Sequence, residues 1–571
     1  MIALAARLTR WRTAAAVAAL LAASTFFFIA YPSIRAGWYG ASQFQDDTFY
    51  YLVTAKNFLR QGVFTFDGRN ATNGFQPLWM TAVVGLYTLI GPESPLDLQI
   101  FTVNLLEKAV LGVALASSVA AFVSAFRREQ PWAAGYLALS LVLLSPFYFV
   151  FDQGMETTLA VLLLLIVTYA FLSERLLLLG ISLALLFLTR LDTAVFVAAP
   201  LLAWTLASAP RSDHRRWIAV AIFGATFLAY VGVNLIATGH AVPISGAIRS
   251  SFPVVRWQGA FFTEPITLAR MFGWWSLLQG INIVESTGLA LAGLILTLAA
   301  RPAPDERNKL LALATVSAAL IANLLMFQKW DKSLDPRYLA MPMAMATMLF
   351  ASALTVAVDR ARSLLVARSK AKTRDGRARG SSPMATLAGA LPVALILVLM
   401  LAEALVQFGR FASHQGRPQD AIRQIFLEIA SVLPRDAVVA GTDVGALAFW
   451  TQRRVINLDG VINNFEYQEY LRAGRLREYL RREGVTHLTT ALWDREQTYT
   501  GRPIEPMYRH VLDPAAERGV DYAEHEFFVY SYLYGVYSDK IALTPADEVY
   551  RKFLGKNGIA DTTYVVYRLP G

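Results

Sequence analysis

The chain has 571 residues, of which 55% are hydrophobic and only 16% are charged, and its formal net charge is +10. This composition is too apolar for a water-soluble enzyme and is typical of a protein that crosses a membrane many times. The chain contains no cysteine, which excludes a disulfide framework, so its external parts must be held by packing.

Apolar stretches long enough to enter or cross a bilayer recur over the first 410 residues and then stop. Eleven membrane spans are predicted, at residues 14–31, 98–126, 131–150, 156–172, 175–188, 192–209, 216–237, 282–300, 309–327, 338–358 and 384–408. The stretch 76–90 is also apolar, and we expect a helix there that lies along the outer membrane surface, since one more span would break the charge pattern of the connections. The predicted fold class is a polytopic α-helical membrane protein.

Arginine and lysine are concentrated in short connections on one side of this predicted bundle. Cytoplasmic connections carry an excess of such residues, so we expect a cytoplasmic N-terminus and a multi-pass protein of a bacterial-type cytoplasmic (inner) membrane. The connection 359–380 alone has eight basic and two acidic residues, a net charge of +6 (8 − 2), which is more than half of the chain's +10. The basic character therefore reflects topology, and no nucleic-acid partner is predicted.

Three regions are predicted on the extracytoplasmic side: the loop 32–97, the connection 238–281 and the C-terminal region. Polarity rises abruptly near residue 410, which divides the chain into a membrane domain, 1–409, and a soluble C-terminal domain, 410–571. In that domain helix-like and strand-like stretches alternate, which predicts a small α/β unit. The helices are expected at 421–433 and 467–482, and the strands at 437–440, 454–458, 485–489 and 564–567.

Asp46 and Asp47 follow the first span, close to the predicted outer face of the membrane. Two neighbouring carboxylates repel, which raises the pKa of one of them unless a cation or hydrogen bonds intervene. A carboxylate beside a surface of low dielectric constant can act as a general base toward a sugar hydroxyl. The alternative is structural, with Asp46 capping the following helix and Asp47 in its first turn. Both interpretations stay open.

Further polar residues are expected on the same side of the membrane. Asn73 and Gln76 precede the surface helix and offer hydrogen bonds to a hydroxylated substrate. Glu156 lies in a short connection, where an acid is costly unless it is paired or functional. Arg190 and Asp192 are expected to pair with each other, in a structural role.

Arg249 and Arg337, the latter followed by Tyr338, are cations on the side that the topological bias disfavours. Guanidinium groups bind phosphate oxygens through paired, charge-assisted hydrogen bonds, so a lipid phosphate is a candidate ligand. Contact with ordinary lipid headgroups is the alternative.

Several of these features, in this order, resemble the GT-C superfamily of integral-membrane glycosyltransferases, and in particular its aminoarabinose transferases and protein mannosyltransferases. The features that carry the resemblance are the acidic pair that opens the long first external loop, the step Pro77-Leu78-Trp79, the short loop Gly154-Met155-Glu156-Thr157, the pair Arg337-Tyr338 before a span, and the C-terminal external domain.

The resemblance implies an enzyme that transfers a sugar from a polyprenyl-phosphate donor, with inversion, to a cell-envelope glycan, glycolipid or protein. By position, Asp46 is implied to be the general base and Asp47 its acidic neighbour, and Arg249 and Arg337 are implied to contact the donor phosphate. Glu156 matches an acid that in some members helps to hold a divalent metal. Where some relatives have another acid, this chain has Phe75. The resemblance therefore leaves the metal open, with Glu156 and His240 as candidate ligands.

Two other functions are compatible with a polytopic protein: a lipid-linked sugar flippase or secondary transporter, and a membrane scaffold that binds glycan. A transporter is expected to place ionisable groups near the middle of the bilayer and often to contain two related halves. Glu107-Lys108 is the one prominent charged pair within a predicted span, and no internal repeat is found. The position of Asp46 and Asp47 favours the enzyme.

Overall fold

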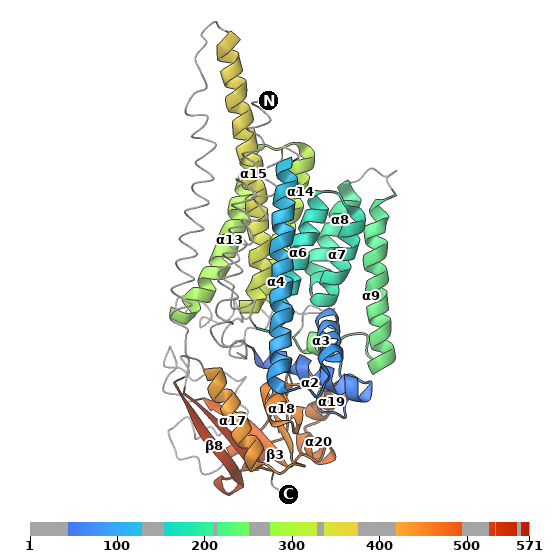
Figure 1. Cartoon of the computed structure of the whole chain (residues 1–571), viewed down its shortest axis with the longest axis vertical. Helices are drawn as coiled ribbons and strands as arrows, with labels where there is room; N and C mark the ends of the chain where they lie inside the picture. The colour runs from blue at the N-terminus through green and yellow to red at the C-terminus, as the bar shows by residue number, and fades with distance from the viewer. Residues whose placement is uncertain are drawn as a thin grey trace.

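The structure is a computed structural model that describes residues 44–127, 153–208, 214–249, 274–327, 336–374, 418–493, 525–531, 533–556 and 561–569. Helices run along the long axis of the molecule, and a domain that contains a β-sheet lies at one end of them (Figure 1). The predicted spans 14–31, 131–150 and 384–408 lie outside the described residues, so the number of eleven spans stays a prediction.

The other eight predicted spans are helical in the structure. They correspond to α4 (Leu96–Arg127), α6 (Thr157–Leu172), α7 (Leu176–Thr189), η3 (Ala194–Ala198) with α8 (Ala199–Ser208), α9 (Arg216–Thr238), α13 (Trp274–Ala300), α14 (Pro304–Ala322) with η4 (Asn323–Phe327), and α15 (Pro336–Arg374). Both η elements are π-helical turns. Within the described residues, three stretches are long and apolar enough to cross a membrane: Arg216–Thr238, Pro304–Leu325 and Arg337–Leu354.

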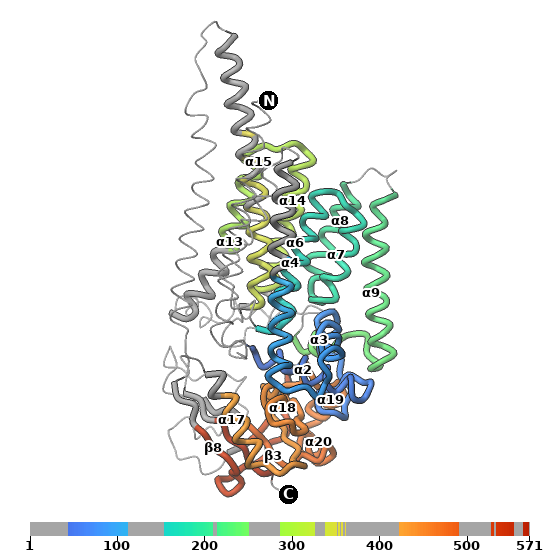
Figure 2. Tube along the Cα trace, viewed as in Figure 1, coloured from blue at the N-terminus to red at the C-terminus, as the bar shows by residue number. Residues whose placement is uncertain are grey.

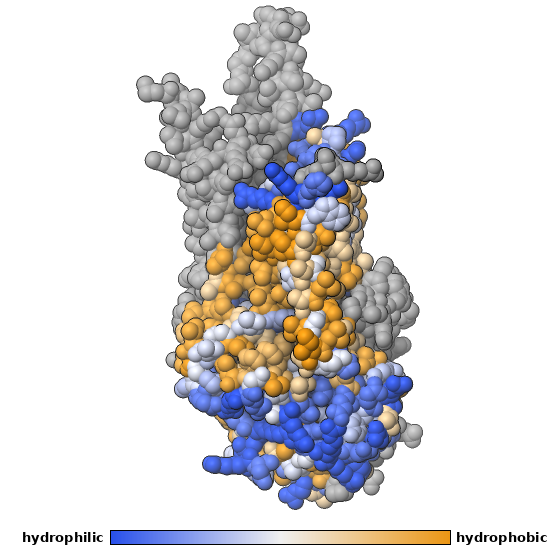
Figure 3. Space-filling model, turned by 90° about the vertical axis from the view of Figure 1, so that its right-hand side faces the viewer, coloured by the Kyte–Doolittle hydropathy of each residue, from blue (hydrophilic) through white to orange (hydrophobic). Residues whose placement is uncertain are grey.

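The helical part of the molecule has an apolar surface. In Figure 3 a broad hydrophobic zone separates the hydrophilic surface of the sheet domain from a smaller hydrophilic zone at the opposite end. On α9, Leu228 is 69% exposed and Ile236 is 89% exposed. Large apolar side chains exposed over so wide a zone are typical of a surface that contacts lipid.

The predicted clustering of basic connections agrees with the arrangement of the helices. The C-terminal end of α8, the start of α9, the junction of α13 with α14 and the C-terminal end of α15 all lie at the end of the bundle remote from the sheet domain (Figure 1). The assignment of this end to the cytoplasm stays a prediction.

Three short helices lie between the bundle and the sheet domain: α2 (Asp46–Gln61), α3 (Pro77–Ile90) and α10 (Ile244–Arg249). Helix α2 ends at Gly62, whose φ of 75° lies in the left-handed region that glycine adopts without strain. Pro77 occupies the first turn of α3, where its missing N–H is not needed. The predicted helix at 76–90 is thus confirmed, and its position along a membrane surface stays a prediction.

The C-terminal domain has the predicted α/β character. Its five-stranded sheet has the order β2-β1-β3-β9-β8, in which β1, β2 and β3 are parallel and β9 and β8 are antiparallel to their neighbours. The strands are β1 (Val438–Gly441), β2 (Arg454–Asn457), β3 (His487–Trp493), β8 (Glu548–Lys556) and β9 (Asp561–Arg568). The helices are α17 (Pro418–Val432), α18 (Gly445–Thr451), α19 (Phe465–Arg472) and α20 (Leu476–Arg482). Two small sheets, β4 (His525–Phe527) with β7 (Ile541–Leu543) and β5 (Tyr530–Ser531) with β6 (Val536–Tyr537), complete it, with a 3-10 turn, η8 (Pro545–Asp547).

The single helix predicted at 467–482 is wrong in one respect, since it is divided into α19 and α20. The division falls at Gly474, which has a φ of 65°. A left-handed residue ends a helix, and the charged periodicity on both sides of it concealed the break.

Helices α2 and α3 and the C-terminal domain share one hydrophobic core. The ring of Phe49 in α2 lies 5.2 Å from the ring of Phe449 and 6.4 Å from that of Trp450, both in α18. Figure 2 shows the early blue segment and the late orange segment in contact. The two ends of the described chain therefore build one structural unit.

A buried ion pair in this unit gives a testable expectation. The Glu483 side chain is 1% exposed, and its carboxylate accepts a hydrogen bond from Arg454 Nη2 at 2.7 Å. Replacing Arg454 with methionine is expected to destabilise the protein by about 3 kcal/mol, because the buried Glu483 carboxylate then loses a positively charged partner. Thermal unfolding of the purified full chain measures the effect. The control Arg475→Met removes an exposed pair with Glu478, at 3.3 Å, and should cost less than about 0.5 kcal/mol. Equal shifts in Tm would contradict the expectation.

Candidate active site

An open cavity lies where the helical bundle meets the C-terminal domain. It contains about 850 Å³ of empty space, including its opening to solvent. Its lining comes from seven parts of the chain: Asp47, Tyr50 and Tyr51; Gly74, Phe75 and Gln76; Met155 and Glu156; Arg190, Leu191 and Asp192; Ser245, Gly246 and Arg249; Arg337 and Tyr338; and Val461 and Ile462. Most of the polar residues predicted for the site are therefore brought together.

The two adjacent aspartates point in different directions. Successive side chains of a helix diverge by about 100° around its axis. Asp47 lines the cavity, and its Oδ2 lies 2.6 Å from Arg337 Nη2. Asp46 is not among the lining residues. Its two carboxylate oxygens accept hydrogen bonds from the backbone N–H groups of Gly445 and Ala446 in α18, each at 2.8 Å.

The structural interpretation of this pair needs a correction. The N-cap residue of α2 is Gln45, without a side-chain cap bond, and both aspartates lie in the first turn. Asp46 therefore caps no part of its own helix and binds the start of a helix about 400 residues later in the chain. Asp46 does not line the cavity, and its role as the general base stays a prediction.

The pKa values of the two carboxyl groups are shifted in opposite directions. Burial alone would raise the pKa of Asp47, but the charges of Arg337 and Arg249 lower it below its ordinary value, so Asp47 is ionised at neutral pH. Burial raises the pKa of Asp46 to about 7, with a further contribution from the charge of Asp47, against the lowering effect of its bonds to Ala446 and Gly445.

The raised pKa of Asp46 predicts a dependence of stability on pH. The folded state holds this proton more tightly than an unfolded chain, in which the ordinary pKa of 3.8 applies. The resulting stabilisation is complete below that value and is lost as the pH rises through about 7. We expect the Tm of the full chain to fall more between pH 5 and pH 8 than the Tm of the variant Asp46→Asn. Parallel pH profiles of the two proteins would contradict this.

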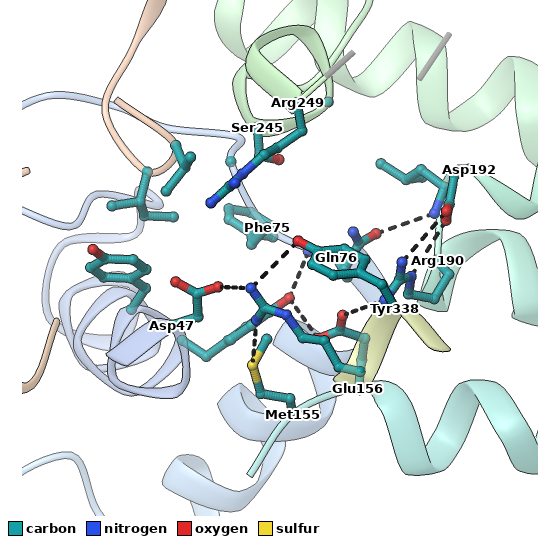
Figure 4. Close-up of a pocket in the computed structure, with 18 residues that line it drawn as sticks. Asp47, Phe75, Gln76, Met155, Glu156, Arg190, Asp192, Ser245, Arg249 and Tyr338 are labelled. Carbon is teal, nitrogen blue, oxygen red and sulfur yellow. Dashed lines mark hydrogen bonds and ion pairs between the residues drawn. The ribbon is translucent and has the colours of Figure 1, made fainter. Parts of the chain in front are cut away.

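Glu156 and Arg190 form the wall of the cavity that lies across from Asp47 (Figure 4). Glu156 is 4% exposed and accepts a hydrogen bond from the Tyr51 hydroxyl at 3.2 Å, and Arg190 Nη1 lies 3.7 Å from its Oε1. The predicted pairing of Arg190 with Asp192 is confirmed, with two contacts of 3.4 Å. A buried charge network of this kind fixes the orientation of its side chains.

Arg249, Arg337 and Tyr338 face the same space. Figure 4 shows Arg249 extending into the cavity from the helix opposite Asp47. Arg337 Nη2 lies 3.4 Å from the Tyr338 hydroxyl, and the guanidinium groups of Arg190 and Arg337 lie 5.5 and 5.1 Å from the centre of the Tyr338 ring. Three guanidinium groups around one cavity favour an anionic ligand.

Two predicted residues have other roles. The Asn73 amide donates to Asn234 Oδ1 at 2.9 Å and to the carbonyl of Val242 at 3.1 Å, and its oxygen accepts from the backbone of Ile244 at 3.0 Å. Asn73 thus holds α9 and α10 together and does not line the cavity, unlike Gln76. His240 is exposed and stacks on Phe465 of the C-terminal domain, with ring centres 3.9 Å apart.

The residues of the cavity do not fit a divalent metal. Among the described residues, no group of three or more histidine, aspartate or glutamate side chains could hold one. The three acids that line the cavity, Asp47, Glu156 and Asp192, each lie within ion-pair distance of a guanidinium group. Guanidinium groups therefore already pair with the carboxylates that a metal ion would need as ligands. His240, the predicted ligand, does not line the cavity.

Sequence reasoning missed the part of the site that comes from the C-terminal domain. Val461 and Ile462 line the cavity, and they follow Asp459, which lies just beyond the end of β2. Asp443 follows the neighbouring strand β1, and its backbone N–H lies 3.3 Å from Asp459 Oδ2. The carboxyl ends of parallel strands meet at one edge of a sheet, and polar residues placed directly after two such strands were a usable signal.

Comparisons with known proteins agree with this architecture. No protein-family model and no curated protein matches the sequence. Among solved structures, the oligosaccharyltransferase of Archaeoglobus fulgidus in the apo form is 12% identical, with 83% of this chain and 69% of that chain covered and a TM-score of 0.50. This level of likeness shows a shared fold.

A second solved structure is similar over nearly the whole length of both chains. It is ArnT from Cupriavidus metallidurans bound to undecaprenyl phosphate, which is 13% identical, with 96% of this chain and 97% of that chain covered and a TM-score of 0.49.

Proposed function

We propose that this protein is an inverting glycosyltransferase, which moves a sugar from a polyprenyl-phosphate donor to a hydroxyl-bearing acceptor of the cell envelope. The observation that carries the proposal is the convergence of one ionised carboxylate, Asp47, with Arg249 and Arg337 in a single cavity. Residues of the helical bundle, such as Arg190 and Arg337, and residues of the C-terminal domain, Val461 and Ile462, line the cavity, which therefore lies at their boundary. Figure 3 shows the apolar surface of the bundle beside the polar surface of this domain. A donor with a lipid tail and a polar acceptor could meet at such a boundary.

The protein is proposed to act at the outer face of a bacterial-type cytoplasmic membrane. The N-terminus lies in the cytoplasm in this proposal, and the C-terminal domain lies outside, since the basic connections gather at the end of the bundle remote from the cavity. The fold shared with an oligosaccharyltransferase supports this kind of reaction as a family-level expectation.

Asp47 is the residue that we assign to the acceptor. Its carboxylate takes the proton of the acceptor hydroxyl while the hydroxyl oxygen forms a bond to the anomeric carbon. The bond from that carbon to the phosphate oxygen breaks on the opposite side of the sugar, which inverts the configuration. The lowered pKa of Asp47 keeps it ionised and ready at neutral pH.

Arg249 and Arg337 are assigned to the phosphate. The leaving lipid phosphate carries away the electron pair of the broken bond, and two guanidinium groups stabilise this charge by paired hydrogen bonds, so that no general acid is required. Arg337 also contacts Asp47, at 2.6 Å, and therefore links the acceptor side of the cavity to the donor side. No metal ion takes part in this scheme.

The proposal is tested by incubating the purified full chain, in detergent or nanodiscs, with radiolabelled polyprenyl-phosphate sugars and cell-envelope acceptors. The expected result is a labelled acceptor together with free polyprenyl phosphate, and neither product in the variant Asp47→Asn. If no donor is consumed while labelled donor crosses the bilayer of reconstituted vesicles, the protein is a flippase and the proposal fails.

A further inference from the structure

The C-terminal domain is joined to the first external loop by contacts on both sides of one turn. The turn comprises residues 457–463, and its middle residues Val461 and Ile462 line the cavity. On one side of the turn, Asn457 Nδ2 donates to the Tyr50 hydroxyl at 2.8 Å, and that hydroxyl lies 3.2 Å from Asp459 Oδ2. The turn thus depends on α2 for its position.

On the other side, the turn lies directly against the segment that precedes α3. The Thr72 hydroxyl donates to the carbonyl oxygen of Asn463 at 2.7 Å. Gly74 approaches so closely that an added Cβ would lie 2.0 Å from the carbonyl oxygen of Val461. There is no room here for the domain to move toward the membrane part.

Asp46 completes this attachment from the first turn of α2, four residues before Tyr50. Each of its carboxylate oxygens accepts one backbone N–H of α18, from Gly445 and Ala446. Gly445 is required at this point, since an added Cβ would lie 2.3 Å from the backbone oxygen of Asp46. We call these contacts of Asp46, Tyr50, Thr72 and Gly74 with residues 445–463 the docking seam.

The seam and the cavity use neighbouring residues of one helix. Asp46 and Tyr50 hold the C-terminal domain, while Asp47, between them in sequence, faces the cavity. A helix is a rigid unit, so a rotation of α2 relative to the domain would shift the Asp47 carboxylate against the wall formed by Val461 and Ile462. Misplacing a reacting group by about 1 Å can cost ~10²-fold in rate.

We infer that Asp46 is a positioning residue: by binding the backbone of Gly445 and Ala446 it fixes the C-terminal domain on α2, and this docking sets both the direction of Asp47 and the wall of the cavity. The inference rests on the proposed transferase reaction. It assigns to the first aspartate a role that is distinct from proton transfer.

The test combines two variants that open the seam from opposite sides, Asp46→Asn and Gly445→Ala. Each is expected to lower kcat by about 10- to 100-fold with the KM for the donor unchanged within about twofold. The kcat of the double variant should be no lower than that of the less active single variant, because both changes disrupt the same contact. The control Lys56→Met removes a contact between α2 and Gln452 of the same domain, and should keep the wild-type kcat.

Amide hydrogen exchange gives a second readout, which does not need activity. The amides of residues 457–463 are expected to exchange faster in both seam variants and to remain as in the wild type in Lys56→Met. Wild-type kcat in Gly445→Ala together with an inactive Asp46→Asn would overturn the inference and return Asp46 to the chemistry. Unchanged exchange in both variants would also overturn it. If the wild-type protein transfers no sugar, the proposed function fails, and the exchange data alone then decide whether Asp46 holds the domain.

Discussion

Replacing Asp47 with asparagine is expected to lower the kcat for sugar transfer by about 10³-fold, with little change in the KM for the donor. Asparagine keeps the size of the side chain but cannot accept a proton from the acceptor hydroxyl. The loss should therefore fall on the chemical step. Steady-state rates with saturating donor measure it, and single-turnover rates confirm that the chemical step is affected.

Asp46→Asn is the matched comparison for this experiment, since it makes the same chemical change at the adjacent position. Its loss should be smaller, about 10- to 100-fold, and should be reproduced by Gly445→Ala. A variant Asp47→Asn with nearly normal kcat, beside an inactive Asp46→Asn, would show that the first aspartate is the base and that Asp47 serves only to hold Arg337.

Arg249→Gln is expected to lower kcat/KM by about 10²-fold, because it removes one of the two guanidinium groups assigned to the leaving phosphate. Arg249→Lys should recover part of this loss, since lysine keeps the charge but not the paired hydrogen bonds. Arg307→Gln is a suitable control. It removes one positive charge from an exposed position of α14, at the end of the bundle remote from the cavity, and should leave kcat/KM unchanged.

The variant Arg249→Gln should also change the pH dependence of the reaction. The charge of Arg249 helps to lower the pKa of Asp47, so its removal raises that pKa. Transfer requires the ionised carboxylate, and the acidic limb of the pH–rate profile should therefore move to higher pH in Arg249→Gln. A loss of rate with an unshifted acidic limb would indicate that Arg249 binds the donor without influencing Asp47.

The sequence predicted most of the elements that the structure describes, because the signals for them are local. Runs of apolar residues predicted the helices of the bundle, and Pro77 marked the start of α3. The alternation of strand-like and helix-like stretches predicted the α/β character of the C-terminal domain, although Gly474 divides one expected helix in two.

The site was predicted only in part, for a geometric reason. Charged residues are rare beside a membrane because they are costly there, and this signal predicted Glu156, Arg249 and Arg337. Asn73 was predicted only because it is polar and precedes α3, and its amide is instead used between α9 and α10. Local composition does not distinguish a polar group that faces a cavity from one that binds its own backbone.

The amino-acid sequence by itself determined the membrane class, the helices and the α/β domain, since hydrophobicity and its period act over a few residues. Only the tertiary structure decided which of two adjacent carboxylates faces the cavity. That choice depends on the rotation of α2, and contacts with Gly445, Asn457 and Asp459 fix this rotation from about 400 residues away in the chain. Neighbouring side chains of a helix lie about 100° apart around its axis, and the sequence alone does not show which of the two faces the cavity.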